Sequence, residues 1–353
     1  MKKLRPNPMS RANIFSYLSY WWLNDLFAEG SKRALQESDM FELDASNMSA
    51  EITRDSERNW EKEIQRSEKA TEPSLIRAVA MTYRRGFVLC GVLAFIEECL
   101  RTAVPVLIAY LVKYFENQTV TPVWHAYAYA AGISVFTILL PFFHHQYHYI
   151  AHRIGWRMRA STCALMYKKT LRLSQKSLND TTTGQIINLG ATDVLRFDLL
   201  PGFLHYLWVG PLQFLIVGII LWQEIGIAVL SGMGVLILIM FLQTFSGRAF
   251  GKIRSMTAVL TDERIRLMNE VITGMRIIKM YAWEKPFAKL VLNTRRKEVE
   301  KILLSSSLKA FNFCFYACQD KILTFVTLLV YVALGGSITA SELYLVLFEE
   351  VSP

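Results

Sequence analysis

The sequence predicts an all-α membrane protein whose helices continue beyond the bilayer, and two observations support this fold class. First, 52% of the 353 residues are hydrophobic, and they gather into long apolar segments instead of alternating with polar residues. Second, five of these segments reach the roughly 20 helical residues that a hydrocarbon core of about 30 Å requires. We expect five full crossings and an incomplete sixth, at about residues 87–115, 124–151, 203–222, 225–250, 303–334 and 341–353.

Residues 1–72 precede the membrane part and divide into an aromatic piece and a charged linker. The piece Ile14–Phe27 is rich in Trp, Tyr and Phe, which favour the headgroup boundary, so we expect it on the inner leaflet. The polar stretch Ser38–Thr71 predicts a linker with a helix around Glu57–Ala70. The amphipathic stretch Leu75–Arg85 predicts a short interfacial elbow helix that leads into the first crossing.

Basic residues are distributed unevenly among the loops, although the net charge is +9. Lys and Arg crowd into residues 1–85, 152–200 and 250–303 but are scarce around 116–123, 223–226 and 335–341. This positive-inside pattern predicts a multi-pass protein with a cytoplasmic N-terminus, and it argues against nucleic-acid binding. Asn117-Gln118-Thr119 matches the N-glycosylation pattern in the first outside loop. Met1–Pro6 lacks the apolar core of a cleaved signal peptide.

The two long cytoplasmic stretches, about 152–200 and 250–303, predict helices that leave the membrane and return. Apolar residues in the second stretch recur every three or four positions, as on one face of a helix. The runs Thr181–Gln185 and Thr273–Met275 interrupt these helices near their midpoints, and each predicts a hairpin tip. At about 1.5 Å per residue, some 25 residues carry each tip roughly 35–40 Å beyond the bilayer. Such stalks indicate a partner at the tips.

Three runs of residues resemble the subfamily C ABC exporters, the multidrug resistance-associated protein family. They are Asn7–Leu35, Thr182–Asp198 and Met268–Glu284, of which the last is the most specific. These runs are similar to the family's lasso and its two coupling-helix regions, and the resemblance continues to about Leu343. It implies a type IV exporter transmembrane domain at residues 73–353, with a lasso and linker at 1–72. Gly190-Ala191 stands where the family usually has a bulkier residue and Ser, which predicts a looser first coupling element.

The resemblance implies an ATP-driven exporter of organic anions and amphipathic drugs in the plasma membrane. Neither the Walker pattern G-x-x-x-x-G-K-[ST] nor a signature like L-S-G-G-Q occurs in the sequence, and a phosphate-binding loop is indispensable for ATP binding by this mechanism. We therefore expect a chain that stops before the first nucleotide-binding domain, with no catalytic residue and no bound cofactor, whereas the full-length family uses ATP and magnesium. The implied partners are the lipid bilayer, anionic substrates, the nucleotide-binding domains and a second transmembrane half. The residues expected to contact nucleotide-binding domains are Thr183, Gly184, Gln185, Thr273, Gly274, Arg276, Lys279, Tyr281 and Trp283.

Three charged residues lie inside the first predicted crossing, namely Glu97, Glu98 and Arg101. A charge at a helix centre costs about 2.5–3.5 kcal/mol on insertion scales, so these side chains should face protein or water. One interpretation is an i, i+4 ion pair between Glu97 and Arg101 in the bundle interior. The other is a lining of the substrate cavity, with Glu98 as the contact because Glu97 has a partner.

His144, His148 and His152 recur every four residues on one face of the second crossing. Three imidazoles in a row can bind a metal or carry protons, but positions on one straight helix cannot all converge on a tetrahedral ion. We expect no metal there. The family resemblance implies that His144 and His148 line the substrate cavity instead.

Aromatic faces and one lysine complete the expected cavity. Aromatic residues on membrane helices often serve packing or face lipid, but the resemblance implies that Phe203 and Tyr316 contact substrate. Lys321 is a candidate for pairing with an anionic substrate, and its alternative partners are Asp320 and backbone carbonyls.

Two other functions compete with export. The chain could act as a truncated, non-transporting interaction or regulatory subunit. It could also belong to a channel or secondary transporter, a class that predicts short loops and broken membrane helices instead of long stalks.

Overall fold

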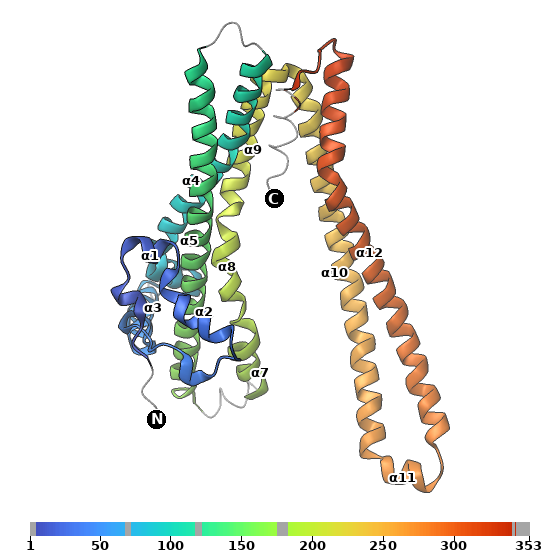
Figure 1. Ribbon diagram of the computed structural model, residues 1–353. Coiled ribbons are helices and arrows are strands. Elements are labelled where there is room, and N and C mark those ends of the chain that lie inside the picture. The colour runs from blue at the N-terminus through green and yellow to red at the C-terminus, as the bar shows by residue number, and fades with distance from the viewer. Residues whose placement is uncertain (1–4, 68–71, 117–121, 175–182, 341–342, 344–353) are drawn as a thin grey trace. The chain divides into compact units, whose positions relative to one another are not determined.

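The computed structural model describes residues 5–67, 72–116, 122–174, 183–340 and 343, and this described part is helical, without β-strands (Figure 1). The chain divides into two compact units, residues 1–216 and 217–353. The predicted glycosylation position Asn117 and the predicted sixth crossing, apart from Leu343, lie outside the described residues.

The first unit begins with short helical turns, several of which contact the long helix α5 (Val123–Thr170). These are η1 (Pro8–Arg11), α1 (Ile14–Leu18), η2 (Trp21–Leu23), α2 (Asn24–Gly30), η3 (Glu37–Asp39) and η4 (Ala45–Asn47). The Asn13 side chain caps α1 by accepting a hydrogen bond from the Ser16 backbone N–H at 2.8 Å. The Tyr20 hydroxyl donates to the His145 carbonyl at 3.0 Å, which ties the aromatic piece to α5.

Helix α3 (Ser49–Ser67) starts well before the predicted helix Glu57–Ala70 and contacts both α4 (Leu75–Glu116) and α5. Its buried side chains, Ile52, Thr53, Ser56 and Glu63, recur on one face. Because most of that face precedes Glu57, packing against α4 and α5 accounts for the longer helix. The charged linker is therefore largely a docked helix.

The predicted elbow Leu75–Arg85 is not a separate element, because it forms the first turns of α4. No proline or turn sequence separates it from the first crossing, so the helix continues through it. Helices α4 and α5 pack along each other, and at about 1.5 Å per residue both are longer than a hydrocarbon core is thick. The core of the unit is buried between these helices and the start of α9; it comprises Cys90, Ala94, Tyr147, Ala151, Ile154, Met158 and Val209.

The first loop returns through α7 (Thr183–Asn188), a π-helical turn (Leu189–Asp193), α8 (Arg196–Leu204) and α9 (Tyr206–Ile225), the last of which continues into the second unit. The π-helical turn contains Gly190-Ala191, where the sequence predicts a looser element. Helix α8 packs on α5, and Arg159 of α5 forms an ion pair with Asp198 at 2.6 Å.

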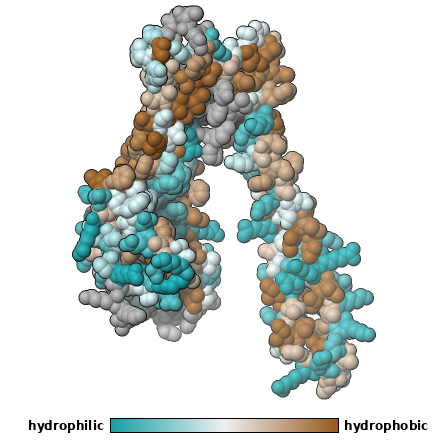
Figure 2. Space-filling model, in the orientation of Figure 1, coloured by the Kyte–Doolittle hydropathy of each residue, from teal (hydrophilic) through white to brown (hydrophobic). Residues whose placement is uncertain are grey.

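The second unit contains a long hairpin of α10 (Val229–Thr273) and α12 (Glu284–Ala333), joined by α11 (Met275–Met280). The turn at Thr273–Met275 is therefore confirmed as the hairpin tip. Gly232 allows the arms to approach closely, since a Cβ there would lie 2.4 Å from Thr327 Oγ1. Figure 2 shows hydrophilic side chains projecting from the arms near the tip, with apolar patches between them.

Three helical stretches are long and apolar enough to cross a membrane: Val123–Thr170, Gly184–Thr273 and Glu284–Ala333. The second stretch includes several of the helices named above. Helix α4 carries Glu97, Glu98 and Arg101 within its apolar part. The number of crossings stays a prediction.

Candidate functional site

The tip of the second hairpin, which is the long hairpin of α10 and α12, is built from a short helix held between two turns. Helix α10 ends at Thr273, and Gly274 begins the break that leads into α11. Ala282 then adopts a left-handed conformation with φ of 53°, which reverses the chain toward α12. The Trp283 backbone N–H donates to the Ile278 carbonyl at 2.9 Å, and the Ile278 side chain is buried. These contacts give the tip a defined conformation.

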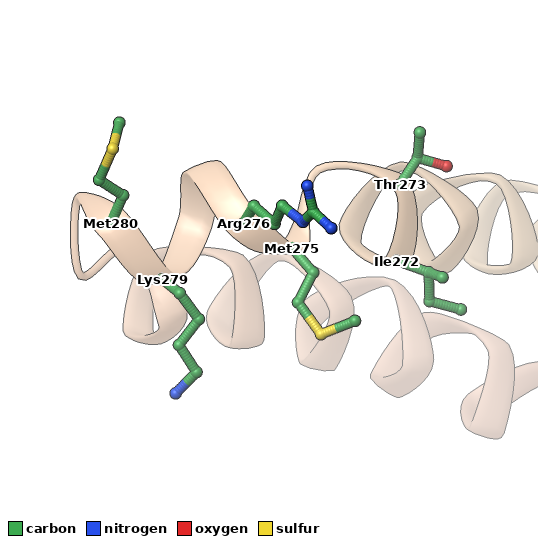
Figure 3. Close-up of a pocket in the computed structure, with 6 residues that line it drawn as sticks. All are labelled: Ile272, Thr273, Met275, Arg276, Lys279 and Met280. Atoms are coloured by element: carbon green, nitrogen blue, oxygen red, sulfur yellow. The ribbon is translucent and has the colours of Figure 1, made fainter.

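The surface of the tip is apolar and basic. Met280 is 71% exposed and Tyr281 is 57% exposed, and the Tyr281 ring stacks on Trp283 with centroids 5.2 Å apart. Figure 3 shows a pocket at the junction of α10 and α11, with the Arg276 guanidinium reaching back toward the end of α10. Its lining residues are Ile272, Thr273, Met275, Arg276, Lys279 and Met280.

One ion pair closes the turn between α11 and α12. Lys279 Nζ lies 3.0 Å from Glu284 Oε1. The backbone N–H of Glu284 itself, followed by the Lys279 ammonium, lowers the pKa of the Glu284 carboxyl. Six predicted coupling residues thus lie in one compact segment: Thr273, Gly274, Arg276, Lys279, Tyr281 and Trp283. Their contact with a nucleotide-binding domain stays a prediction.

The other three predicted coupling residues begin the returning part of the first loop. Thr183, Gly184 and Gln185 form the first turn of α7, where Gly184 and Gln185 are exposed. The preceding part of that predicted tip, up to residue 182, lies outside the described residues.

A buried carboxylate that sequence reasoning did not identify fastens the two arms of the second hairpin together. Glu298 of α12 is 2% exposed and accepts hydrogen bonds from Thr261 Oγ1 at 2.7 Å and Arg264 Nε at 2.8 Å, both on α10. Arg295 Nη1 donates to it at 2.7 Å. The Thr261 hydroxyl, Arg295 and Arg264 lower the pKa of Glu298 to about 2, so it is ionised at neutral pH. The sequence could reveal this site only if the axial alignment of α10 against α12 were already known.

The charged residues of α4 meet a histidine of α5. Of the two interpretations, the ion pair is confirmed, since Arg101 Nη2 lies 2.7 Å from Glu97 Oε1 and Glu97 is 1% exposed, whereas contact of Glu98 with a substrate stays a prediction. His144 Nδ1 lies 2.7 Å from the same oxygen, and Arg101 Nε lies 3.8 Å from Glu98 Oε2. Both glutamates therefore contact the Arg101 guanidinium, and His144 contacts Glu97.

The histidine row forms a ladder of rings along α5. The ring centroids of His144 and His148 are 4.5 Å apart, and those of His148 and His152 are 6.3 Å apart. Within the described residues, no group of three or more His, Cys, Asp or Glu side chains is arranged to hold a metal ion.

The remaining cavity candidates are distributed over both units. Phe203 lies in α8 of the first unit and is 68% exposed. Tyr316 and Lys321 lie in α12 of the second unit, and both are exposed. A cavity shared by these residues stays a prediction.

Comparisons with known proteins agree with this architecture. The profile of the ABC transporter transmembrane region matches residues 87–351. The chain is 44% identical to ATP-binding cassette sub-family C member 4 of mouse over 346 residues, which is 97% of this chain and 26% of that protein. The human member 4 gives the same identity over 347 residues, with the same shares of the two chains. The Drosophila melanogaster "Probable multidrug resistance-associated protein lethal(2)03659" is 31% identical over 98% of this chain and 25% of its own length.

The match assigns this helical architecture to a known kind of membrane domain. Member 4 is also the relative that the run Met268–Glu284 resembles in the sequence. The chain spans about a quarter of the length of these curated relatives. With long helices, apolar crossings and a family match over most of its length, the chain belongs to the subfamily C ABC transporters, as a multi-pass transmembrane part of the type IV exporter fold.

Proposed function

We propose that this chain supplies the first transmembrane half of an ATP-driven exporter of organic anions and amphipathic drugs. The observation that carries the proposal is the exposed tip Thr273–Glu284 at the end of two long arms. Met, Tyr, Trp and Arg side chains are enriched at protein interfaces, and this tip presents all four kinds to solvent. A nucleotide-binding domain is the partner that such a tip would engage in this family.

The two arms suit this role because a lever transmits motion only if it keeps its shape. Glu298 links α12 to α10 through hydrogen bonds from Thr261 and Arg264, at a level between the tip and the apolar part of the hairpin. Movement of the tip by a bound domain would therefore displace both arms together. The exposed Gly184 and Gln185 of α7 are the proposed counterpart in the first loop.

The proposed substrate-binding surface combines aromatic side chains with charged side chains that are paired with one another. Arg101 lies within ion-pair distance of Glu97 and Glu98, which reduces the negative charge that an anionic substrate would meet. His144 and His148 add polar edges near that pair, and Phe203, Tyr316 and Lys321 would offer aromatic faces and a cationic group. Amphipathic anions need an apolar surface together with a few placed polar groups.

The test uses a full-length transporter that contains this chain, in inside-out vesicles with a fluorescent organic anion. Replacing both Arg276 and Trp283 with Ala should lower ATP-dependent uptake about fivefold or more, with substrate binding unchanged. The matched control is Arg296→Ala, whose 84% exposed side chain pairs only with Glu300 along the same arm in the described structure. Uptake that is unaffected by the tip variant would contradict the coupling role. ATP-dependent uptake by the purified chain alone, with no ATPase present, would overturn the proposed dependence on nucleotide-binding domains.

A further inference from the structure

The turn η4 that precedes helix α3 is held by two arginines of α5. Arg157 Nη2 donates to Asn47 Oδ1 at 2.6 Å and to the Ser46 carbonyl at 3.1 Å. The side-chain oxygen of Ser46 lies 3.1 Å from Arg157 Nη2 and 3.2 Å from Arg153 Nη2. Two guanidinium groups therefore converge on one exposed serine hydroxyl.

This arginine pair carries more positive charge than its surroundings neutralise. Asp44 is the carboxylate that reaches it among the described residues, with Oδ2 3.8 Å from Arg153 Nη2. The Ser46 hydroxyl also donates to Asp44. Burial, and then repulsion by Arg153, lowers the pKa of the Arg157 guanidinium, and a further anion would relieve that repulsion.

We propose that Ser46 is a phosphorylation site and that Arg153 and Arg157 receive its phosphate. A protein kinase would transfer the γ-phosphoryl group of ATP to Ser46 Oγ, forming the new O–P bond while the bond from the γ-phosphorus to the bridging oxygen of ADP breaks. The hydroxyl proton leaves to the base of the kinase. The predicted cytoplasmic position of residues 1–72 gives a kinase access to this turn.

The phosphate would strengthen a contact that is already in place. A phosphoserine adds a charge of about −1.5 to −2 and three acceptor oxygens, and opposite an arginine cluster it makes one to three charge-assisted hydrogen bonds. Asp44 is about two-fifths exposed, at 43%, so its side chain can turn toward water as the phosphate takes its place.

The consequence reaches helix α3, which follows the turn directly. Its interface with α4 and α5 buries one large apolar residue, Ile52, beside Thr53 and Ser56, whose hydroxyls have no hydrogen-bond partner in the described structure. The polar contacts that hold it lie further along the helix, where Asn59 donates to Thr82 at 2.9 Å and Glu57 and Glu63 form ion pairs with Lys168 and Arg77. A buried unpaired hydroxyl costs stability, so the first turns of α3, next to Ser46, are the part whose docking a few new hydrogen bonds can strengthen. Phosphorylation would hold α3 on the membrane helices.

The experiment places phosphoserine at position 46 of the full chain by amber-codon incorporation and measures hydrogen–deuterium exchange in lipid nanodiscs. Exchange of residues 49–67 should slow about fivefold or more relative to the unmodified chain. In a chain carrying Arg153→Gln and Arg157→Gln, phosphoserine at position 46 should not slow exchange relative to the same double variant with unmodified Ser46. This comparison separates the phosphate–arginine contact from a general effect of charge. Unchanged or faster exchange in the arginine-containing chain would overturn the proposal.

Whether cells phosphorylate Ser46 is tested by mass spectrometry of the protein purified from eukaryotic cells with phosphatase inhibitors. Phosphate on the peptide that contains Ser46, absent from a Ser46→Ala variant, supports the site. An unmodified Ser46 in that material would overturn it. Neither readout depends on transport, so failure here leaves the proposed export function untouched.

Discussion

Gly155 provides the sharpest test of how the first loop is held, because it lies where α5 touches the backbone of α8. A Cβ at Gly155 would lie 2.6 Å from the carbonyl oxygen of Phe197 and 2.7 Å from that of Asp198. Real Cβ atoms essentially never lie closer than 3.0 Å to such a neighbour, so the two helices would have to move apart. The opposing atoms belong to the backbone, and no change of rotamer can relieve the clash.

The magnitude of the Gly155→Ala effect follows from two opposing terms. Overpacking a tight contact costs about 1–3 kcal/mol, and a clash with backbone belongs in the upper half of that range. Replacing a mid-helix glycine with alanine recovers about 1 kcal/mol of helix propensity. The net expectation is a loss of about 1–2 kcal/mol, which corresponds to a Tm lower by roughly 2–8 °C.

Differential scanning fluorimetry of the chain in nanodiscs measures this change. Gly210→Ala is the matched control, because Gly210 is also within a helix of the first unit, but a Cβ added there would have no heavy atom within 4 Å. That variant should match or exceed the wild-type Tm. If Gly155→Ala were as stable as Gly210→Ala, the close contact between α5 and α8 would be wrong.

Substitutions at three further sites, Glu298, Ala282 and Arg101, test other contacts. Because the pKa of Glu298 falls from 4.5 to about 2 on folding, its contribution is complete above about pH 4.5 and is lost as the pH falls toward 2. Glu298→Gln should therefore weaken the hairpin at neutral pH and remove that acid dependence, as measured by limited proteolysis at pH values from about 3 to about 7. Ala282→Gly should raise Tm, since a left-handed conformation costs an L-residue about 1–2 kcal/mol, and Ala282→Val should lower it, since a β-branched side chain fits that conformation still less well. Arg101→Met should cost about 3–5 kcal/mol by leaving the buried Glu97 with His144 but without its arginine partner, and adding Glu97→Gln should restore part of the loss in the same Tm assay.

Local signals in the sequence are sufficient to predict the second hairpin and one ion pair. The turn at Thr273–Met275 is predictable because helical periodicity on both sides is interrupted by glycine. The Glu97–Arg101 pair follows from i, i+4 spacing on one helix. Both features depend on residues close together in the chain, so no knowledge of helix packing is needed.

Features that depend on contacts between distant segments cannot be predicted in the same way. His144 joins Glu97 across 47 positions, and Glu298 meets Thr261 across 37. The start of α3 at Ser49 likewise depends on burial against α4 and α5, which the charged sequence does not reveal. Sequence patterns indicate which face of a helix is apolar, but they do not give the axial register between two helices that decides these contacts.

A polar contact, and not an apolar core, fixes the register of the two hairpin arms near the tip. Two helices that pack only against each other bury little surface, and from residue 250 to residue 303 the buried residues are Ile278, Thr294 and Glu298, two of which are polar. Hydrogen bonds to an ionised carboxylate are directional and strong, so Glu298 fixes the register of the arms with little buried apolar area. The apolar side chains that the arms cannot bury, such as Met280, remain exposed at the tip, where a partner domain can cover them.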